Sequence, residues 1–368
     1  MAATTVVNAA YDTSGNGGRK LVRLSNGWLI AGAYDSTNKQ VNLYKSTDNG
    51  ATWARLCFMS DGSYGSVGFS MAARGTNVYV AVPRYASTNL SSIHFFNIEA
   101  TNQADVKVTK AGDIDTAQND FLGNSLIVNE SGTELHAAWA SRNSTYPNTF
   151  NIRYAKGTID VSGNVTWGSI TQLTTNSSSG LDCKNPSVVV NKSGNPVVIF
   201  DQANPAGISC RVFDGSIWAP KTVYNTGGVT YTQSNPCAVV DGNGVIHVVW
   251  HGTDASAATQ PNVWYSKSTD GGINWSARVN LTNNGNARGQ FRPSISIDNN
   301  NKLYVFFVGT ASGTFLQIRK IIYDGTSWSP ITDITNNTTN HTDNVSAMEK
   351  EKNSMIGFIW QDLQAAAV

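Results

Sequence analysis

The sequence predicts an all-β protein of four-stranded sheets that follow one another in a ring, and three observations carry this prediction. The chain has 33 Gly and ten Trp, with many Asn, Thr and Ser, which is typical of short strands joined by turns. Seven similar hairpins recur, with turn-to-turn separations between 48 residues (Gly27 to Gly75) and 62 residues (Gly132 to Gly194). Several hairpins are followed by a strand that begins with Trp. This period predicts a seven-bladed β-propeller with four antiparallel strands per blade.

Each blade is expected to begin with a hairpin of two apolar strands, because apolar residues alternate on both sides of a Gly or Asn turn. The seven hairpins span residues 20–35, 69–85, 124–141, 186–202, 236–252, 293–309 and 345–362. The Trp-led outer strands span residues 53–59, 167–176, 218–226, 275–284 and 328–337.

The two ends of the chain are expected to meet in the last blade. Only six residues follow the seventh hairpin, too few for two more strands, whereas residues 4–10 (TTVVNAA) resemble an outer strand. We therefore expect the N-terminal strand to close the last blade, which removes exposed strand edges. One domain then covers residues 1–368.

Charge and composition exclude several classes of partner. The formal net charge is +1, 14% of residues are charged, and no Lys/Arg run occurs, so nucleic acid is not an expected partner. No apolar run reaches the roughly 18 residues of a membrane helix, so no membrane insertion is expected, and the N-terminus lacks the features of a signal peptide. The four cysteines lack metal-site spacing and are interpreted as buried free thiols, with a Cys183–Cys210 disulfide as the alternative.

Two turns carry a recognisable motif, S-x-D-x-G-x-x-W. Its residues are Ser46, Asp48, Gly50 and Trp53 in the first copy, and Ser268, Asp270, Gly272 and Trp275 in the second. The motif resembles the Asp box, or BNR repeat, of the sialidase-like β-propellers. The resemblance implies a structural role, since Asp accepts backbone N–H bonds in the turn and Gly supplies the positive φ.

The resemblance also implies which residues a sialidase would need, and this chain departs from them. Sialidases bind the substrate carboxylate with three arginines and use a Tyr nucleophile with a Glu partner. Arg19 lies near the place of the first arginine without the usual Pro, and Arg292 precedes Pro293 in a more similar motif. Asn185 and Asn235 occupy places where Arg or Glu is expected, and no Glu opens a middle-blade hairpin. The Tyr-Ser opening expected in a late blade is replaced by Asp343-Asn344-Val345-Ser346. We therefore predict a sialidase-like propeller without an intact sialidase catalytic set.

One face of a propeller gathers the starts of the innermost strands and the ends of the second strands. The starts contribute Arg19, Asp120, Asn185, Asn235, Arg288, Arg292, Asp343 and Asn344. The ends contribute Tyr34, Asp35, Arg84, Tyr85, Trp139, Arg142, Asp201, Gln202, Trp250, His251, Trp360, Gln361 and Asp362. Sugars suit such a face, because their hydroxyls pair with carboxylates and guanidinium groups and their C–H faces stack on aromatic rings.

The predicted function is carbohydrate binding, by an extracellular or virion-associated glycan receptor. The predicted ligand-binding residues are Arg19, Asp35, Arg84, Tyr85, Arg142, Asp201, His251, Arg288, Arg292 and Asp362. The alternative is a glycoside hydrolase or polysaccharide lyase with its active site at the channel mouth, using His251 with Tyr85, or carboxylates such as Asp35 and Asp201. A third hypothesis is a structural adhesin in a virion or cell-surface assembly. No cofactor or metal site is expected, with a calcium ion in the channel left open.

Overall fold

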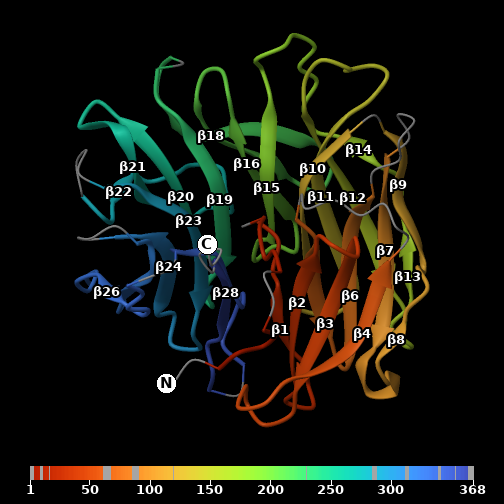
Figure 1. Ribbon diagram of the computed structural model, residues 1–368. Coiled ribbons are helices and arrows are strands. Elements are labelled where there is room, and N and C mark those ends of the chain that lie inside the picture. Colours follow the sequence, from red (N-terminus) through yellow and green to blue (C-terminus); the bar gives the residue numbers. More distant parts are fainter. Residues whose placement is uncertain are drawn as a thin grey trace.

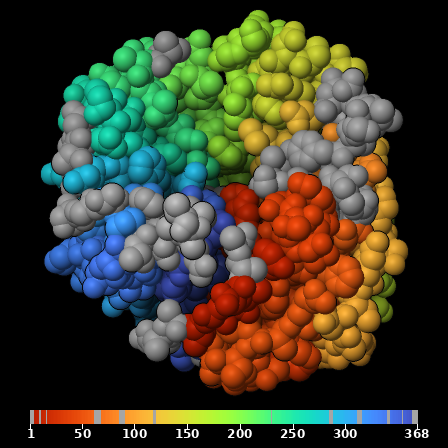
Figure 2. All heavy atoms as spheres, viewed as in Figure 1, coloured from red at the N-terminus to blue at the C-terminus, as the bar shows by residue number. Residues whose placement is uncertain are grey.

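A computed structural model describes residues 4–8, 11–15, 17–60, 68–84, 91–118, 120–228, 230–283, 288–310, 315–338, 341–352 and 354–363. The chain runs around a ring of sheets in sequence order (Figure 1). The space-filling view shows the same order, with the first and last parts of the chain side by side (Figure 2). Of the described residues, only Ala100–Asn102 form a helical turn, and none belongs to a helix long and apolar enough to cross a membrane.

Six sheets have four or five strands and form complete blades. The first contains β1 (Leu21–Arg23), β2 (Leu29–Asp35), β3 (Gln40–Ser46), β4 (Ala54–Ser60) and β8 (Val106–Lys107). The second contains β5 (Ser70–Arg74), β6 (Asn77–Arg84), β7 (Ser91–Glu99) and β9 (Gly112–Gln118). The third contains β10 (Asp120–Val128), β11 (Glu134–Arg142), β12 (Asn151–Ile159), β13 (Val165–Trp167) and β14 (Thr171–Gln172).

The next three blades have four strands each. The fourth contains β15 (Cys183–Val190), β16 (Pro196–Gln202), β17 (Gly207–Phe213) and β18 (Trp218–Asn225). The fifth contains β19 (Gln233–Val240), β20 (Ile246–Asp254), β21 (Ala257–Ser268) and β22 (Val279–Asn280). The sixth contains β23 (Gln290–Ile297), β24 (Leu303–Gly309), β25 (Gln317–Tyr323) and β26 (Thr332–Asp333).

The last sheet corrects the predicted blade count. The all-β propeller is confirmed, but six blades are complete rather than seven, since among the described residues β27 (His341–Ala347) and β28 (Phe358–Leu363) pair only with each other. Residues 4–8 form no strand, so the predicted N-terminal closing strand is wrong for that part, while residues 9–10 lie outside the described residues. Val6 instead packs on the apolar cluster that joins this hairpin to the first blade. Apolar packing, rather than strand pairing, therefore joins the two ends here.

Hydroxyl groups of the innermost strands join neighbouring sheets around the ring. The Oγ of Ser70 accepts from Leu126 N–H at 2.8 Å, and the same contact recurs for Ser125, Ser187 and Ser294 with the next inner strand. Ser346 Oγ accepts from Lys20 N–H at 3.0 Å, which links the last hairpin to the first blade. These bonds satisfy backbone donors that face a neighbouring sheet.

Apolar clusters fill the spaces between adjacent sheets. Trp139 and Trp250, at equivalent places in β11 and β20, are fully buried, and their indole N–H groups donate to Asp115 and Gln233. These rings therefore pack the blades. All four cysteines are buried and free, so the Cys183–Cys210 disulfide is not formed.

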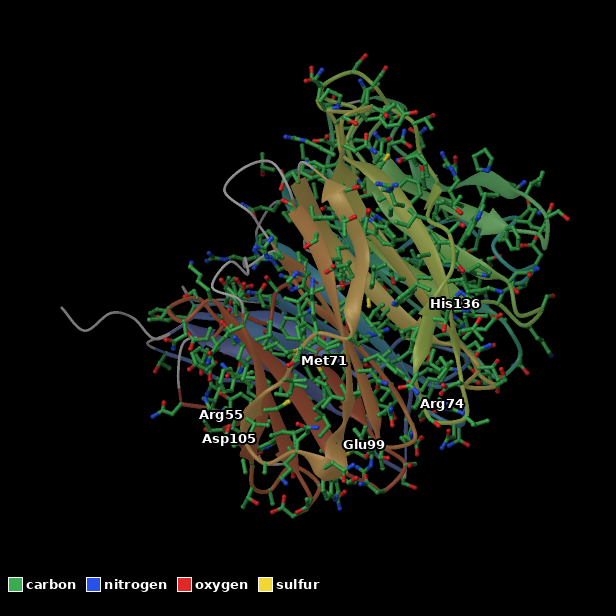
Figure 3. The ribbon with its side chains drawn as sticks, turned by 90° about the vertical axis from the view of Figure 1, so that its right-hand side faces the viewer. Arg55, Met71, Arg74, Glu99, Asp105 and His136 are labelled. Atoms are coloured by element: carbon green, nitrogen blue, oxygen red, sulfur yellow. The ribbon has the colours of Figure 1, made fainter. Side chains whose placement is uncertain are left out.

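The rim of the molecule is held together by polar contacts as well. Arg55 on β4 pairs with Asp105, just before the short strand β8 that extends the first blade (Figure 3). His136 on β11 is buried, and its Nδ1 lies 2.6 Å from the Tyr154 hydroxyl (Figure 3). The first contact joins outer strands of one blade, and the second joins β11 to β12, so both serve the blade structure.

The two S-x-D-x-G-x-x-W turns have the same hydrogen-bond pattern. In the first, Ser46 Oγ donates to Asp48 at 2.7 Å and accepts from Gly50 N–H at 2.8 Å. Ser268 makes the equivalent bonds with Asp270 and Gly272, both at 2.8 Å. The indoles of Trp53 and Trp275 each donate to the Gly carbonyl of their own turn.

Candidate functional site

Five inner strands begin with a bulge whose key residue has a left-handed backbone. These residues are Gly123, Asn185, Asn235, Arg292 and Asn344, with φ between 48° and 68°. Gly and Asn tolerate this conformation, whereas an Arg there is strained by about 1 to 2 kcal/mol. Backbone strain of this kind occurs at functional sites, so Arg292 marks a place where the side chain matters.

Asp201, at the end of β16, is the most buried carboxylate beside these bulges, with 7% exposure. Its Oδ2 accepts three hydrogen bonds, from Asn185 Nδ2 at 2.7 Å, Ser234 Oγ at 2.8 Å and Asn235 N–H at 3.0 Å. Its Oδ1 accepts no hydrogen bond from the described residues. This oxygen is not one of the fully buried polar atoms that lack a partner, so part of its surface contacts solvent. Burial raises the pKa of Asp201 despite these hydrogen bonds.

His251 occupies the equivalent place in the next blade, opposite Ser234 in the β19–β20 ladder. Its Nδ1 accepts from the backbone N–H of Arg292 at 3.3 Å, so in the neutral ring the proton lies on Nε2. Burial, and then the charge of Arg292, lower the pKa of His251 to about 4. The imidazole is therefore a neutral hydrogen-bond donor at ordinary pH, and its geometry does not suit a general base.

Arg292 and Asp343 continue the cluster into the last two sheets. The Arg292 guanidinium forms an ion pair with Asp343 Oδ1, and 43% of the Arg292 side chain remains exposed. Asn344 N–H donates to the same carboxylate oxygen at 2.8 Å. An arginine that forms an ion pair while much of its side chain stays exposed can also contact a ligand.

The segment before the first blade completes the cluster. Asn344 Nδ2 donates to Asp12 Oδ1 at 3.2 Å and to Gln361 Oε1 at 3.1 Å. Ser14 donates to both oxygens of Asp12, through its N–H and its Oγ, at 2.8 Å each. Thr13 Oγ1 donates to the Asn344 carbonyl oxygen at 2.7 Å. These contacts link residues more than 300 positions apart.

We call this set the mouth network. It consists of Asp12, Asn185, Asp201, Ser234, His251, Arg292, Asp343, Asn344 and Gln361. It combines a buried carboxyl with a raised pKa, a carboxylate paired with arginine, and a neutral imidazole. Such groups match the needs of a site where one carboxyl donates a proton and another stays charged.

The mouth network contains three of the predicted ligand residues, which are Asp201, His251 and Arg292. Two others, Arg19 and Asp35, bond to protein groups outside the network. Arg19 is 7% exposed, and its guanidinium donates to the carbonyl oxygens of Ala238, Ile295 and Ala347. Asp35 is 1% exposed and accepts from Thr37, Asn38 and Tyr11. Burial acts to raise the pKa of Asp35, but these hydrogen bonds outweigh it and lower the pKa. Both side chains therefore serve the fold where they lie.

The remaining predicted ligand residues lie outside the network. Arg142 is half-buried over the ring of Phe150, at 4.2 Å, and Asp362 is exposed and accepts from the Trp360 indole. Arg84 is half-buried at the end of β6, and Arg288 is exposed. Tyr85 lies outside the described residues.

Ser234 and Asp12 are members of the network that the sequence analysis missed. Ser234 precedes the Asn235-Pro236 bulge, and Asp12 belongs to an Asp-x-Ser pair, which are signals visible only after the seven hairpins are aligned. In the part of the chain that the structure describes, no three His, Cys, Asp or Glu residues are grouped to hold a metal ion. Buried Arg19 also places positive charge at the inner strands, whereas burial lowers the pKa of neighbouring Lys20 to about 7.

The lowered pKa of His251 predicts acid sensitivity. Its pKa is about 4 in the folded protein and ordinarily 6.5, and the same holds for buried His136. Between pH 6.5 and pH 4 these imidazoles therefore bind protons in the unfolded chain but not in the folded protein. Their contribution to the free energy of unfolding is complete above pH 6.5 and decreases as the pH falls toward 4. We expect urea midpoints to fall between pH 7 and pH 5, and by less in His251→Gln. An equal fall in both proteins would contradict this assignment.

Comparison with known proteins finds solved structures of similar fold. No protein-family model matches the chain, and no curated protein is significantly similar to it in sequence. A substituted form of an α-L-arabinofuranosidase from Fusarium graminearum, with an iminosugar inhibitor, is similar at TM-score 0.53 and 13% identity, covering 81% of this chain and 90% of that one. An α-L-arabinanase from Penicillium chrysogenum, with arabinobiose, is similar at TM-score 0.51 and 14% identity, covering 81% and 92%. At these identities the likeness establishes a shared fold.

Proposed function

We propose that this protein is a glycoside hydrolase whose active site is the mouth network. The observation that carries the proposal is Asp201, a buried carboxyl with one oxygen held by three donors and the other without a hydrogen bond from the described residues. Burial raises the pKa of this carboxyl above its ordinary value, which favours the protonated form. A protonated carboxyl that reaches solvent is the group a glycosidase needs to protonate the leaving oxygen.

The other members of the mouth network have roles that follow from their chemistry. Asp201 donates its proton to the glycosidic oxygen as the bond to the anomeric carbon breaks. The Asp343 carboxylate either takes a proton from the attacking water or attacks the anomeric carbon itself. His251 donates from Nε2 to a sugar hydroxyl, and the open part of the Arg292 guanidinium binds another.

This arrangement favours hydrolysis over the two other carbohydrate functions. A lyase needs a free base, and the Nδ1 lone pair of His251 is occupied by Arg292 N–H. A receptor needs no carboxyl with a raised pKa. Two solved enzymes of similar fold are an arabinofuranosidase and an arabinanase, so arabinans are the first substrates to test. A polysaccharide substrate also suits the extracellular or virion-associated location, which stays a prediction.

The test is product release from a panel of neutral and sialylated glycans, followed by mass spectrometry. The panel contains arabinan, arabino-oligosaccharides, xylan, galactan and sialyllactose. Release of sugars from a neutral glycan is expected. Binding without release would overturn the hydrolase proposal in favour of a glycan receptor. An absence of both would overturn the carbohydrate function and favour a protein-docking scaffold.

Replacement of the strained arginine separates function from stability. Arg292→Asn places in this bulge the residue that three equivalent bulges contain. We expect stability to stay level or rise by about 1 kcal/mol, because the backbone strain is relieved and the half-exposed ion pair contributes little. We expect kcat/KM to fall by about tenfold or more, because one charged hydrogen bond to substrate is lost.

Urea unfolding and kcat/KM on the same preparation provide the measurement. Arg142→Asn is the matched control, since Arg142 is half-buried outside the network. A loss of stability in Arg292→Asn with kcat/KM unchanged would show that Arg292 serves the fold alone.

A further inference from the structure

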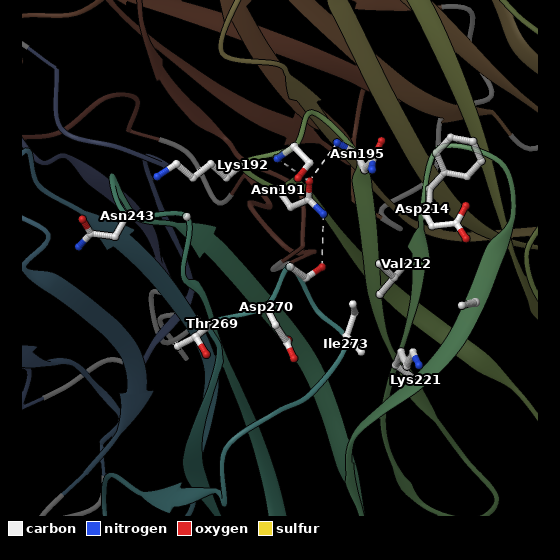
Figure 4. A pocket seen from close by; sticks show the side chains of 15 residues that line it. Asn191, Lys192, Asn195, Val212, Asp214, Lys221, Asn243, Thr269, Asp270 and Ile273 are labelled. Carbon is white, nitrogen blue, oxygen red and sulfur yellow. Dashed lines mark hydrogen bonds between the residues drawn. The ribbon is translucent and has the colours of Figure 1, made fainter.

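A groove of about 560 Å³ lies at the opposite ends of the strands, between the fourth and fifth blades (Figure 4). Turns from both blades line it: residues 191–195 between β15 and β16, 241–244 between β19 and β20, and the Asp-box turn after β21. Strands β17 and β18 form its remaining wall. The mouth network lies at the other ends of the same strands, so the groove is a separate site.

The walls of the groove are fixed by contacts between the turns. Asn191 Oδ1 accepts from the N–H groups of Ser193 and Asn195, at 3.0 Å each, and its Nδ2 donates to the Gly271 carbonyl at 3.4 Å (Figure 4). A Cβ added to Gly244 would lie 2.7 Å from the side chain of Lys192, so these two turns pack closely. The groove is therefore preformed, which lowers the entropic cost of binding.

Six polar side chains that line the groove have no hydrogen-bond or ion-pair partner among the described residues. They are Lys192, Ser193, Asn195, Lys221, Asn243 and Thr269. Each can bind a ligand without first breaking a protein contact. Together they offer ammonium, amide and hydroxyl groups on facing walls.

The charges in the groove balance. Lys192 and Lys221 face Asp214 and Asp270, both carboxylates of rim turns. Hydrogen bonds from Ile217 and Ser216 lower the pKa of Asp214, and bonds from Asn274 lower that of Asp270 against its slight burial, so both stay ionised. Two positive and two negative charges favour an uncharged ligand with many hydroxyls over a phosphate or a uronate.

Apolar atoms contribute the rest of the lining. Val212 and Phe213 come from β17, and Ile273, which is 50% exposed, comes from the Asp-box turn. An exposed aliphatic side chain beside unpartnered amides suits the two faces of a sugar ring, whose C–H groups need apolar contact and whose hydroxyls need polar partners.

We propose that this groove is a second carbohydrate site, which holds a neutral oligosaccharide away from the mouth network. The choice of ligand class rests on the proposed glycoside hydrolase function, whereas the site itself rests on the groove. Such a site retains a long glycan on the protein between cleavage events. Short substrates, which cannot span both ends of the strands, do not use it.

The experiment counts binding sites by calorimetry, with arabino- and xylo-oligosaccharides as probes. Asp201→Asn is the background, because this variant is expected to bind glycan with little turnover. We expect two sites in this background and one after Lys221→Ala and Asn243→Ala are added, with groove affinity weaker by about tenfold or more. Thr269→Trp, which fills the groove, is expected to give the same result. In the otherwise unmodified protein, these groove substitutions should leave turnover of short substrates unchanged.

The control is Lys267→Ala, which removes an exposed lysine that does not line the groove. If the groove variants bind as the control does, the second site is wrong, and the hydrolase proposal still stands on turnover. If turnover is absent but the groove variants lose binding, the hydrolase proposal fails and the second site stands. If no glycan binds to the control or to the groove variants, both the hydrolase proposal and the second-site proposal are overturned.

Discussion

Asp201→Asn is expected to lower kcat on a cleaved glycan by about a hundredfold to ten-thousandfold, the usual contribution of a positioned general acid. The amide preserves the size of the side chain but has no acidic proton to give. Because Oδ2 accepts three bonds in the folded protein, the substitution also keeps most of the local geometry if the amide oxygen takes that place. Glycan affinity should therefore change much less than kcat.

The pH profile distinguishes a proton donor from a structural carboxylate. Asp201 acts only when protonated, so activity should fall as pH rises through its raised pKa. Asn185→Ala removes a hydrogen bond that stabilises the charged form, and we expect the alkaline limb of the profile to move to higher pH. Ser234→Ala should move it in the same direction.

The matched control is Asp362→Asn, an exposed carboxylate on the last hairpin. It should leave kcat and the pH profile unchanged. If Asp201→Asn retains kcat within a few fold of the parent, or if Asn185→Ala leaves the alkaline limb in place, Asp201 is not the acid.

The fold was largely predictable because each blade repeats one local pattern. All seven predicted hairpins form, since alternating apolar residues around a Gly or Asn turn specify a hairpin without distant information. The blade count was not predictable in the same way. A closing strand at residues 4–10 needs ladder partners more than 300 positions away, and similarity to other outer strands does not show that those partners are available.

The candidate site was predictable only in part, because proximity around the ring depends on which side chains the inner strands turn toward each other. Asp201 bonds to Asn235 of the fifth blade, and His251 of the fifth blade bonds to Arg292 of the sixth, so the three lie in successive blades. Arg19 was also placed at the predicted face, but its guanidinium enters the ring and contacts three inner strands. Residue type and strand register predicted the same ligand-binding role for Arg19 and Arg292. Backbone φ at Arg292 and the carbonyl partners of Arg19, which separate them, are properties of the folded chain.

Arg19→Met is expected to destabilise the protein by about 3 to 5 kcal/mol, because a charged group with several buried partners is removed. Nη1 donates to Ile295 O at 2.8 Å and to Ala347 O at 3.2 Å, and Nη2 donates to Ala238 O at 3.0 Å. These carbonyls belong to β19, β23 and β27, whereas Arg19 precedes β1. One side chain therefore ties the start of the first blade to the last three sheets.

The geometry also predicts how other substitutions at this position rank. Arg19→Lys keeps the charge, but one ammonium on a flexible stem does not reproduce the planar fork that reaches three strands, so we expect roughly half the loss. Urea unfolding at pH 7 measures both variants. Arg74→Met is the control, because Arg74 ends β5 at the hairpin turn of the second blade and donates to the Asp160 carbonyl of the third (Figure 3). It also bridges neighbouring sheets, but near solvent, where water replaces the lost bond and the cost is within about 1 kcal/mol. Equal losses in Arg19→Met and Arg74→Met would mean that contacts between adjacent blades alone hold the ring closed.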